Sequence, residues 1–124
     1  MSIHESGEMY LETIYILSLK DPVVRSVDVG EYMGVSKPSV SRAISLLKND
    51  GFVTMNKQGY LGLTQLGEEI AKTIYERHTI LTRLFTNIGV DEKTAEEDAC
   101  RIEHYISERT FDAIKMHIKQ YGKK

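Results

Sequence analysis

The run SVDVGEYMGVSKPSVSRAISLLKNDG, residues 26–51, predicts two helices joined by a tight turn. Ser26 is a suitable N-cap for the first helix, and Gly34 is suited to end it. Ser36 is placed to cap the second helix, and Pro38 then falls in the first turn, where a missing N–H costs no helical hydrogen bond. A short helix, a glycine-containing turn and a second helix predict a helix-turn-helix.

The second helix of this pair has one apolar and one polar face. Val40, Ile44 and Leu47 recur at helical spacing and predict the buried face. Serine hydroxyls, helix-terminal N–H groups and an arginine side chain can bind phosphates or base edges. The residues that we predict to contact DNA here are Ser36, Lys37, Pro38, Ser39, Ser41 and Arg42. A merely solvated polar face is the alternative interpretation.

Two short strands are predicted after this helix, at Phe52–Met55 and Tyr60–Leu63. Lys57 lies in the turn between them and is placed to touch the DNA backbone. A recognition helix followed by a hairpin is a winged helix, so the first part of the chain is predicted to be a winged helix-turn-helix.

Helical patterns precede and follow this unit. We expect one helix from Ser6 to about Leu19, and three more at about 64–88, 92–106 and beyond Ser107. The fold is therefore predicted to be mostly α with a small β-wing. A winged helix-turn-helix at 1–66 is followed by an all-helical part at 67–124, whose apolar stripes predict a homodimer.

Composition narrows the function classes. The 124 residues carry a formal net charge of -2, which argues against coating nucleic acid by charge alone but allows sequence-specific binding. The sequence has no apolar run of membrane-spanning length, so no membrane partner is expected. The single cysteine cannot form an internal disulfide, and a cytoplasmic location is expected.

Three potential metal ligands lie close together in ACRIEHY, residues 99–105. On a helix, Cys100, Glu103 and His104 share one face, because they are spaced i, i+3 and i+4. A thiol, a carboxylate and an imidazole form a transition-metal donor set, and His78 is a further candidate. The alternative is that Cys100 is a buried small hydrophobe and that Glu103 and His104 belong to an ordinary polar helix face. We see no nucleophile or substrate-binding element, so we expect metal sensing rather than an enzyme.

These motifs carry a resemblance to a known family. They are EMYLETIY at 8–15, SKPSVS at 36–41, LTQLG at 63–67, RH at 77–78 and ACRIEH at 99–104. The chain resembles the diphtheria toxin repressor family, which contains iron- and manganese-dependent transcriptional regulators. The resemblance implies a homodimer that binds palindromic double-stranded operator DNA when loaded with divalent metal, usually to repress metal-uptake genes.

The resemblance also implies the metal ligands. Those of the iron-responsive branch fall on Met9, Cys100, Glu103 and His104. The manganese branch has Asp and Glu at the first two of these positions. Glu12 matches a ligand position of the manganese branch, and His78 matches one in both. Thr82 and Glu96 replace the glutamate and histidine of the second iron site, so one or two metals per chain remain open.

The expected identity of the metal follows from the softness of the predicted ligands. Thioether and thiol ligands favour later metals over Mn(II), so we expect Fe(II) in the cell. Mn(II) is the alternative, because of Glu12 and the short two-domain form. Co(II), Ni(II) or Zn(II) should substitute in vitro. Two rival classes are a winged-helix regulator that answers a small ligand or oxidation of Cys100, and a metalloenzyme or metal carrier without a DNA role.

Overall fold

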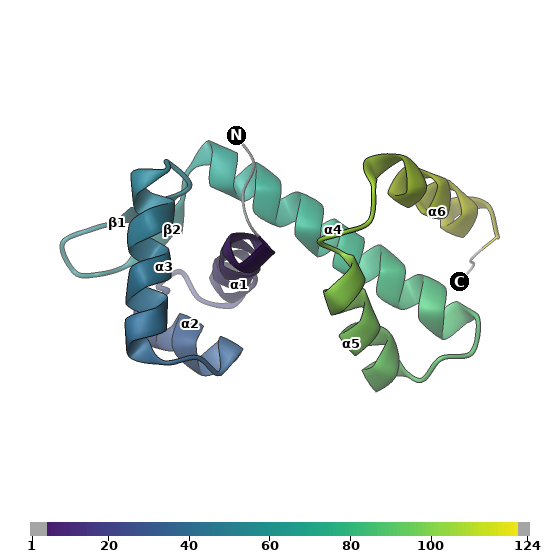
Figure 1. The fold of residues 1–124 in the computed structure, drawn as a ribbon, viewed down its shortest axis with the longest axis horizontal. Helices are drawn as coiled ribbons and strands as arrows, with labels where there is room; N and C mark the ends of the chain where they lie inside the picture. The colour runs from purple at the N-terminus through teal and green to yellow at the C-terminus, as the bar shows by residue number, and fades with distance from the viewer. Residues whose placement is uncertain (1–4, 122–124) are drawn as a thin grey trace. The chain divides into compact units, whose positions relative to one another are not determined.

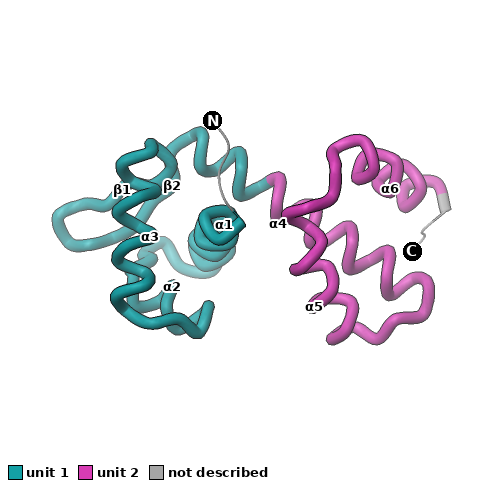
Figure 2. The backbone as a smooth tube through the Cα atoms, in the orientation of Figure 1, with its two compact units in different colours: residues 1–72 teal, residues 73–124 magenta. Residues whose placement is uncertain are grey.

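The computed structural model of the protein describes residues 5–121. They form two compact units, divided between residues 72 and 73, which are coloured separately in Figure 2. The elements shown in Figure 1 are α1 (Glu5–Lys20), α2 (Ser26–Met33), α3 (Lys37–Asn49), β1 (Val53–Met55), β2 (Leu61–Leu63), α4 (Gln65–Asn87), α5 (Glu92–Ile102) and α6 (Glu108–Tyr121). This order confirms the predicted fold class. The long helix α4 continues from the first unit into the second.

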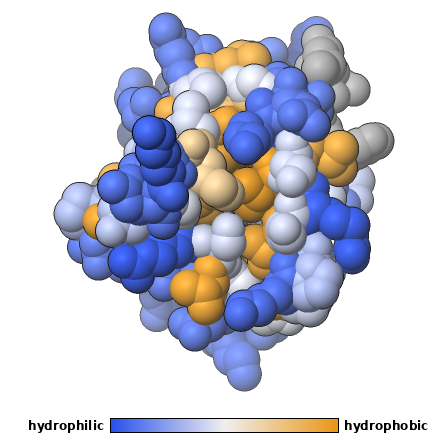
Figure 3. Space-filling model, turned by 90° about the vertical axis from the view of Figure 1, so that its left-hand side faces the viewer, coloured by the Kyte–Doolittle hydropathy of each residue, from blue (hydrophilic) through white to orange (hydrophobic). Residues whose placement is uncertain are grey.

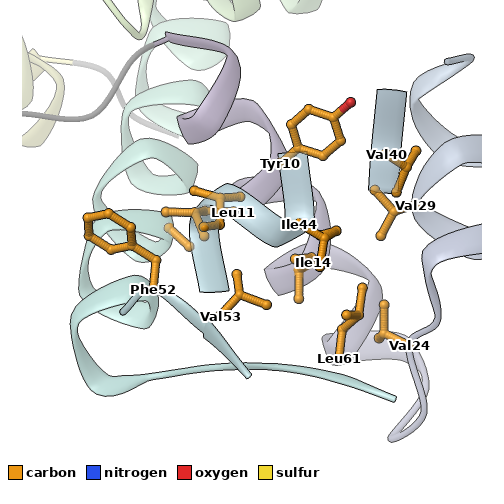
Figure 4. Close-up of a cluster of buried hydrophobic side chains, with 12 residues drawn as sticks. Tyr10, Leu11, Ile14, Val24, Val29, Val40, Ile44, Phe52, Val53 and Leu61 are labelled. Atoms are coloured by element: carbon orange, nitrogen blue, oxygen red, sulfur yellow. The ribbon is translucent and has the colours of Figure 1, made fainter. Parts of the chain in front are cut away.

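The first unit has one hydrophobic core, to which four helices and both strands contribute (Figure 4). The buried side chains labelled in that figure are Tyr10, Leu11, Ile14, Val24, Val29, Val40, Ile44, Phe52, Val53 and Leu61. Burial of this apolar surface is the main favourable term in folding. It holds α3 against α1, α2 and the sheet, and thereby leaves the polar face of α3 outside.

The helix-turn-helix forms as predicted, with one difference at its start. Arg25 and not Ser26 is the N-cap of α2, and the Asp28 carboxylate accepts the backbone N–H of Arg25 at 2.9 Å. Gly34 ends α2 in the left-handed conformation, with φ 71°. Gly30 lies where a Cβ would be 3.3 Å from Val40 Cγ2, so a glycine here lets α2 approach α3 closely.

The wing is a two-stranded antiparallel sheet in which Val53 pairs with Leu63 and Met55 with Leu61. Both strands are one residue shorter than predicted. Phe52 is buried in the core, and its N–H donates to the carbonyl of Leu47 at 2.9 Å, so it lies in the link between α3 and β1. Tyr60 forms an isolated bridge with Arg25 instead of extending β2.

The second unit has its own small core between α4, α5 and α6. Its buried apolar residues are Ile74, Leu81, Ala95, Ala99, Phe111 and Ile118. Asp91 caps α5 by accepting the N–H of Thr94 at 3.0 Å, and Ser107 begins α6 in the same way. The prediction for the end of α5 was wrong, since the helix ends at Ile102 and a turn occupies 103–106.

Candidate metal centre and nucleic-acid interface

Glu103 is the C-cap of α5 and keeps helical geometry. Its φ and ψ are -57° and -26°, and its N–H bonds the carbonyl of Ala99 at 2.9 Å. The i, i+3 relation to Cys100, one turn earlier and half-buried, is therefore kept although the regular helix has ended. Glu103 itself is fully buried, with 0% of its surface exposed.

The buried carboxylate lies between two imidazole rings. Oε1 of Glu103 is 2.9 Å from Nδ1 of His78, and Oε2 is 3.3 Å from Nε2 of His104. The side chain of His78 on α4 is 26% exposed, and that of His104 in the turn is 1% exposed. Residues from α4 and from the end of α5, distant in sequence, thus converge on one carboxylate.

This donor set fits a divalent transition metal. Imidazole nitrogen and carboxylate oxygen are ligands for Zn, Fe, Mn and Co ions, and the thiol of Cys100 lies one helical turn away on α5. A buried carboxylate is costly unless opposite charge or hydrogen bonds compensate it. A cation bound among His78, Glu103 and His104 would supply that compensation. His78, Glu103 and His104 therefore stay predicted metal ligands.

The structure adds Arg77, which the sequence analysis noted only as part of a motif. Its Nη1 donates hydrogen bonds to the carbonyls of Glu103, at 3.1 Å, and Ile106, at 2.9 Å. The position of Arg77 in the sequence indicates that its side chain has a buried partner. Arg77 lies three residues after Ile74 and four before Leu81, on the apolar stripe of α4. A charged residue at such a position requires a buried partner.

The face of α3 opposite the core presents the residues predicted to contact DNA. Lys37, Pro38, Ser41 and Arg42 are exposed, and Ser39 is half-buried. The hydroxyl of Ser36 accepts the N–H of Ser39 at 3.3 Å and donates to Oγ of Ser39 at 3.0 Å, so it first serves to begin the helix. Lys57 is exposed in the turn of the wing.

The wing is held by hydrogen bonds and by one cation that the sequence analysis did not single out. Asn56 Oδ1 accepts the N–H groups of Gln58 and Tyr60, which shapes the turn beside Lys57. The guanidinium of Arg25 lies 5.2 Å from the ring centroid of Tyr60, and a hydrogen bond with Tyr60 raises its pKa. Arg25 thus brings an exposed positive charge to the base of the wing.

This part of the surface is not uniformly basic. Figure 3 shows apolar residues gathered in the middle of one face of the molecule, with hydrophilic residues around them. The exposed apolar residues of the helix-turn-helix and wing are Val27, Tyr32, Val35, Leu46 and Met55. A surface of this mixed kind favours a small number of specific contacts over binding through a broad positive field.

Comparison with known proteins assigns a family to both halves of the chain. Residues 2–63 match the N-terminal DNA binding domain of the iron dependent repressors, and residues 64–123 match their metal binding and dimerisation domain. The chain belongs to the diphtheria toxin repressor family. It is therefore a metal-dependent, DNA-binding transcriptional regulator, as the sequence predicted.

Individual relatives of this chain are also described as regulators. The chain is 34% identical to the transcriptional regulator MntR of Salmonella typhimurium, over 91% of its own length and 72% of the relative's. The solved structure of the manganese regulator SloR superposes with a TM-score of 0.80 at 27% identity, over 96% of this chain. IdeR of T. acidophilum gives 0.78 at 26% identity, over 99%. The chain spans about half of these two solved chains, 55% and 56%.

Two further predicted ligands of the family member lie in the other unit. Met9 on α1 is half-buried, and its carbonyl accepts the hydroxyl of Thr13 at 2.8 Å. Glu12, one turn later on α1, is buried. His78, Cys100, Glu103 and His104 all belong to the second unit.

Among the described residues, no helix is long and apolar enough to span a membrane.

Proposed function

We propose that the chain is a homodimeric repressor that binds a palindromic operator when loaded with Fe(II), and thereby controls genes for metal uptake. The observation that supports this most directly is the buried Glu103 carboxylate between His78 and His104. We further propose residues 1–66 as the DNA-binding domain and 67–124 as the dimerisation and metal-binding domain of a cytoplasmic protein.

The proposed metal ligands come from both parts of the chain. His78, Cys100, Glu103 and His104 are supported by their shared unit and by the contacts of Glu103. Met9 and Glu12 are supported by the family resemblance and by their spacing on one face of α1. Together they offer sulfur, nitrogen and oxygen donors, of which a divalent ion needs four to six.

The choice between Fe(II) and Mn(II) depends on the sulfur ligands. A thioether from Met9 and a thiolate from Cys100 favour Fe(II), Co(II), Ni(II) or Zn(II) over Mn(II). Manganese is the alternative, since SloR is a manganese regulator and Glu12 would add a hard oxygen ligand. The sulfur pair is the feature on which we propose iron.

The link from metal to DNA runs through α1 in this proposal. Inside the first unit α1 packs against α2 and α3, with Leu11 and Ile14 fully in the core that also holds Val40. A cation bound by Met9 or Glu12 therefore acts on the helix that supports the recognition helix. If the DNA-competent state binds the cation more tightly, the population shifts toward that state.

The DNA contacts in this proposal are made by α3 and the wing. Arg42 reads a guanine, the serines and Lys37 bind near the start of α3, and Lys57 binds the flanking backbone. Each protomer reads one half-site, and a symmetric dimer reads a palindrome. The exposure of these side chains on one face of α3 and on the wing supports this arrangement.

The test is an anaerobic fluorescence-anisotropy titration of the protein onto promoter duplexes with Fe(II), Mn(II) or chelator. We expect tight binding with Fe(II), weaker binding with Mn(II) and none with chelator. Cys100→Ala should lose the response to Fe(II), whereas Lys119→Ala, which changes an exposed residue of α6, should keep it. An equal or better response to Mn(II) would assign manganese instead. Binding that ignores chelator would contradict the metal-dependent mechanism.

A further inference from the structure

We propose that Arg77 is a positioning residue of the metal centre. It holds the turn at 103–106 so that Glu103 and His104 keep the directions in which they can share a cation. The inference rests on the proposed metal centre and deepens it, and its experiment separates failure of the two.

The contacts of Arg77 lie at both ends of the turn. Nη1 donates to the carbonyl of Glu103, where α5 has just ended, and to the carbonyl of Ile106, immediately before the N-cap of α6. The last carbonyls of a helix have no intrahelical partner and carry the negative end of the helix dipole. A guanidinium satisfies them with charge-assisted hydrogen bonds, which are stronger than neutral ones.

A third contact holds the guanidinium in place. Its Cζ is 5.6 Å from the centroid of the Phe111 ring, and Phe111 is a buried residue of α6. One side chain from α4 therefore connects the end of α5, the turn and α6. Because it is anchored on both sides, it limits how far the main chain at 103–106 can shift.

The neighbours Arg77 and His78 act on the same residue. Arg77 binds the main-chain carbonyl of Glu103, and His78 lies against its carboxylate oxygen at 2.9 Å. With the backbone and side chain of Glu103 both tied to α4, its carboxylate cannot swing away from the histidines without breaking a bond. His104 is the next residue and takes its direction from the same turn.

If only its charge mattered, Arg77 would weaken the binding of a metal cation at this site. A positive charge beside a cation site repels the cation, so a purely electrostatic effect of removing it would tighten metal binding. Positioning predicts the opposite, because loss of the two hydrogen bonds lets the ligands move. Groups that orient metal ligands typically cost about 10–100-fold in metal affinity when they are removed. The sign of the effect therefore distinguishes the two.

The experiment compares Co(II) binding by the full chain and by Arg77→Met, which keeps an unbranched apolar stem but no donor. Co(II) affinity is measured anaerobically by competition with a chromophoric chelator, and the visible absorption of bound Co(II) reports ligand geometry. We expect Arg77→Met to bind Co(II) about tenfold or more weakly, with an altered spectrum. Arg77→Lys, which keeps the charge but not the planar fork, should lie between wild type and Arg77→Met.

The matched control is Arg101→Met. Arg101 is an exposed cation of α5 whose guanidinium forms an ion pair with half-buried Asp98 on the same helix, at 2.8 Å. Its loss removes the same charge without touching the turn, so Co(II) affinity and spectrum should stay as in wild type. Glu103→Gln tests the metal centre itself and should weaken Co(II) binding strongly.

The outcomes separate the two proposals. Wild-type affinity and spectrum in both Arg77 variants, with Glu103→Gln impaired, would overturn the positioning role and leave the metal centre intact. Unchanged binding in Glu103→Gln would overturn the metal centre and this inference with it. If Arg77→Met does not fold, Arg77→Lys decides: weaker binding with an altered spectrum supports positioning, and wild-type behaviour overturns it.

Discussion

At the scale of a residue, Arg42 and Lys57 are two exposed cations of the proposed DNA interface that should make different contacts with DNA. Arg42 lies on α3, where a planar guanidinium can reach a base edge, whereas Lys57 lies in the wing turn beside Asn56. We expect Arg42→Met to lose discrimination at one base pair, by about 1–3 kcal/mol, because the bidentate contact to guanine is lost. Lys57→Met should weaken binding to all duplexes alike and lower the salt slope by about 1. Anisotropy titrations with saturating metal, over single-base-pair variants and several salt concentrations, measure both effects. Lys20→Met removes an exposed charge at the end of α1 as a control and should change neither. Uniform weakening by Arg42→Met would contradict a base-reading role.

At the scale of an element, α5 offers a test, because an acidic side chain caps its start. Asp91 caps the start, and hydrogen bonds from the backbone and side chain of Thr94 lower the pKa of its carboxyl from the usual 3.8. A carboxyl whose folded-state pKa is lowered stabilises the fold above its unfolded pKa, and this contribution is lost as pH falls through the folded value. Acidification from about pH 5 to pH 3 should therefore lower the unfolding temperature more in wild type than in Asp91→Asn, since asparagine caps without titrating. Thermal unfolding followed by circular dichroism of the metal-free protein measures this. Glu97→Gln, which changes an exposed acid within the same helix, should retain the wild-type pH dependence. The same dependence in Asp91→Asn would show that the cap is not responsible.

At the scale of the whole molecule, metal binding should appear as stability. A ligand that binds only the folded state adds about 2.7 kcal/mol at 100 times its Kd. We expect Mn(II), Co(II) or anaerobic Fe(II) to raise the unfolding temperature of the full chain clearly, and Glu103→Gln to lose most of this increase. Differential scanning calorimetry with and without metal is the measurement. Glu108→Gln, an exposed acid in the first turn of α6, is the control and should respond like wild type. An undiminished increase in Glu103→Gln would place the stabilising metal elsewhere.

Much of the fold was predictable because the signals for it are local. The caps at Ser36, Asp91 and Ser107 each act on an N–H three residues later, so the sequence alone locates the start of a helix. The apolar face of α3 likewise follows from its own periodicity. Residue types and spacing also sufficed to select Glu103 and His104 as a candidate ligand pair and to reveal the family.

Long-range contacts decided the remaining features. The end of α5 was predicted at Ile106 but lies at Ile102, where Arg77, 26 and 29 residues earlier in the chain, binds the carbonyls of Glu103 and Ile106. Near the start of α4, Gly67 lies so close to the carbonyl of Phe52 that a Cβ would be 2.1 Å from it, a contact with a residue 15 positions earlier in the chain. The contact between His78 and Glu103 also joins residues far apart in the chain, and residue spacing could not predict it. Local pattern specifies which residues start a helix and face its core, but the partner of a buried polar group comes from another element, and only packing brings the two together.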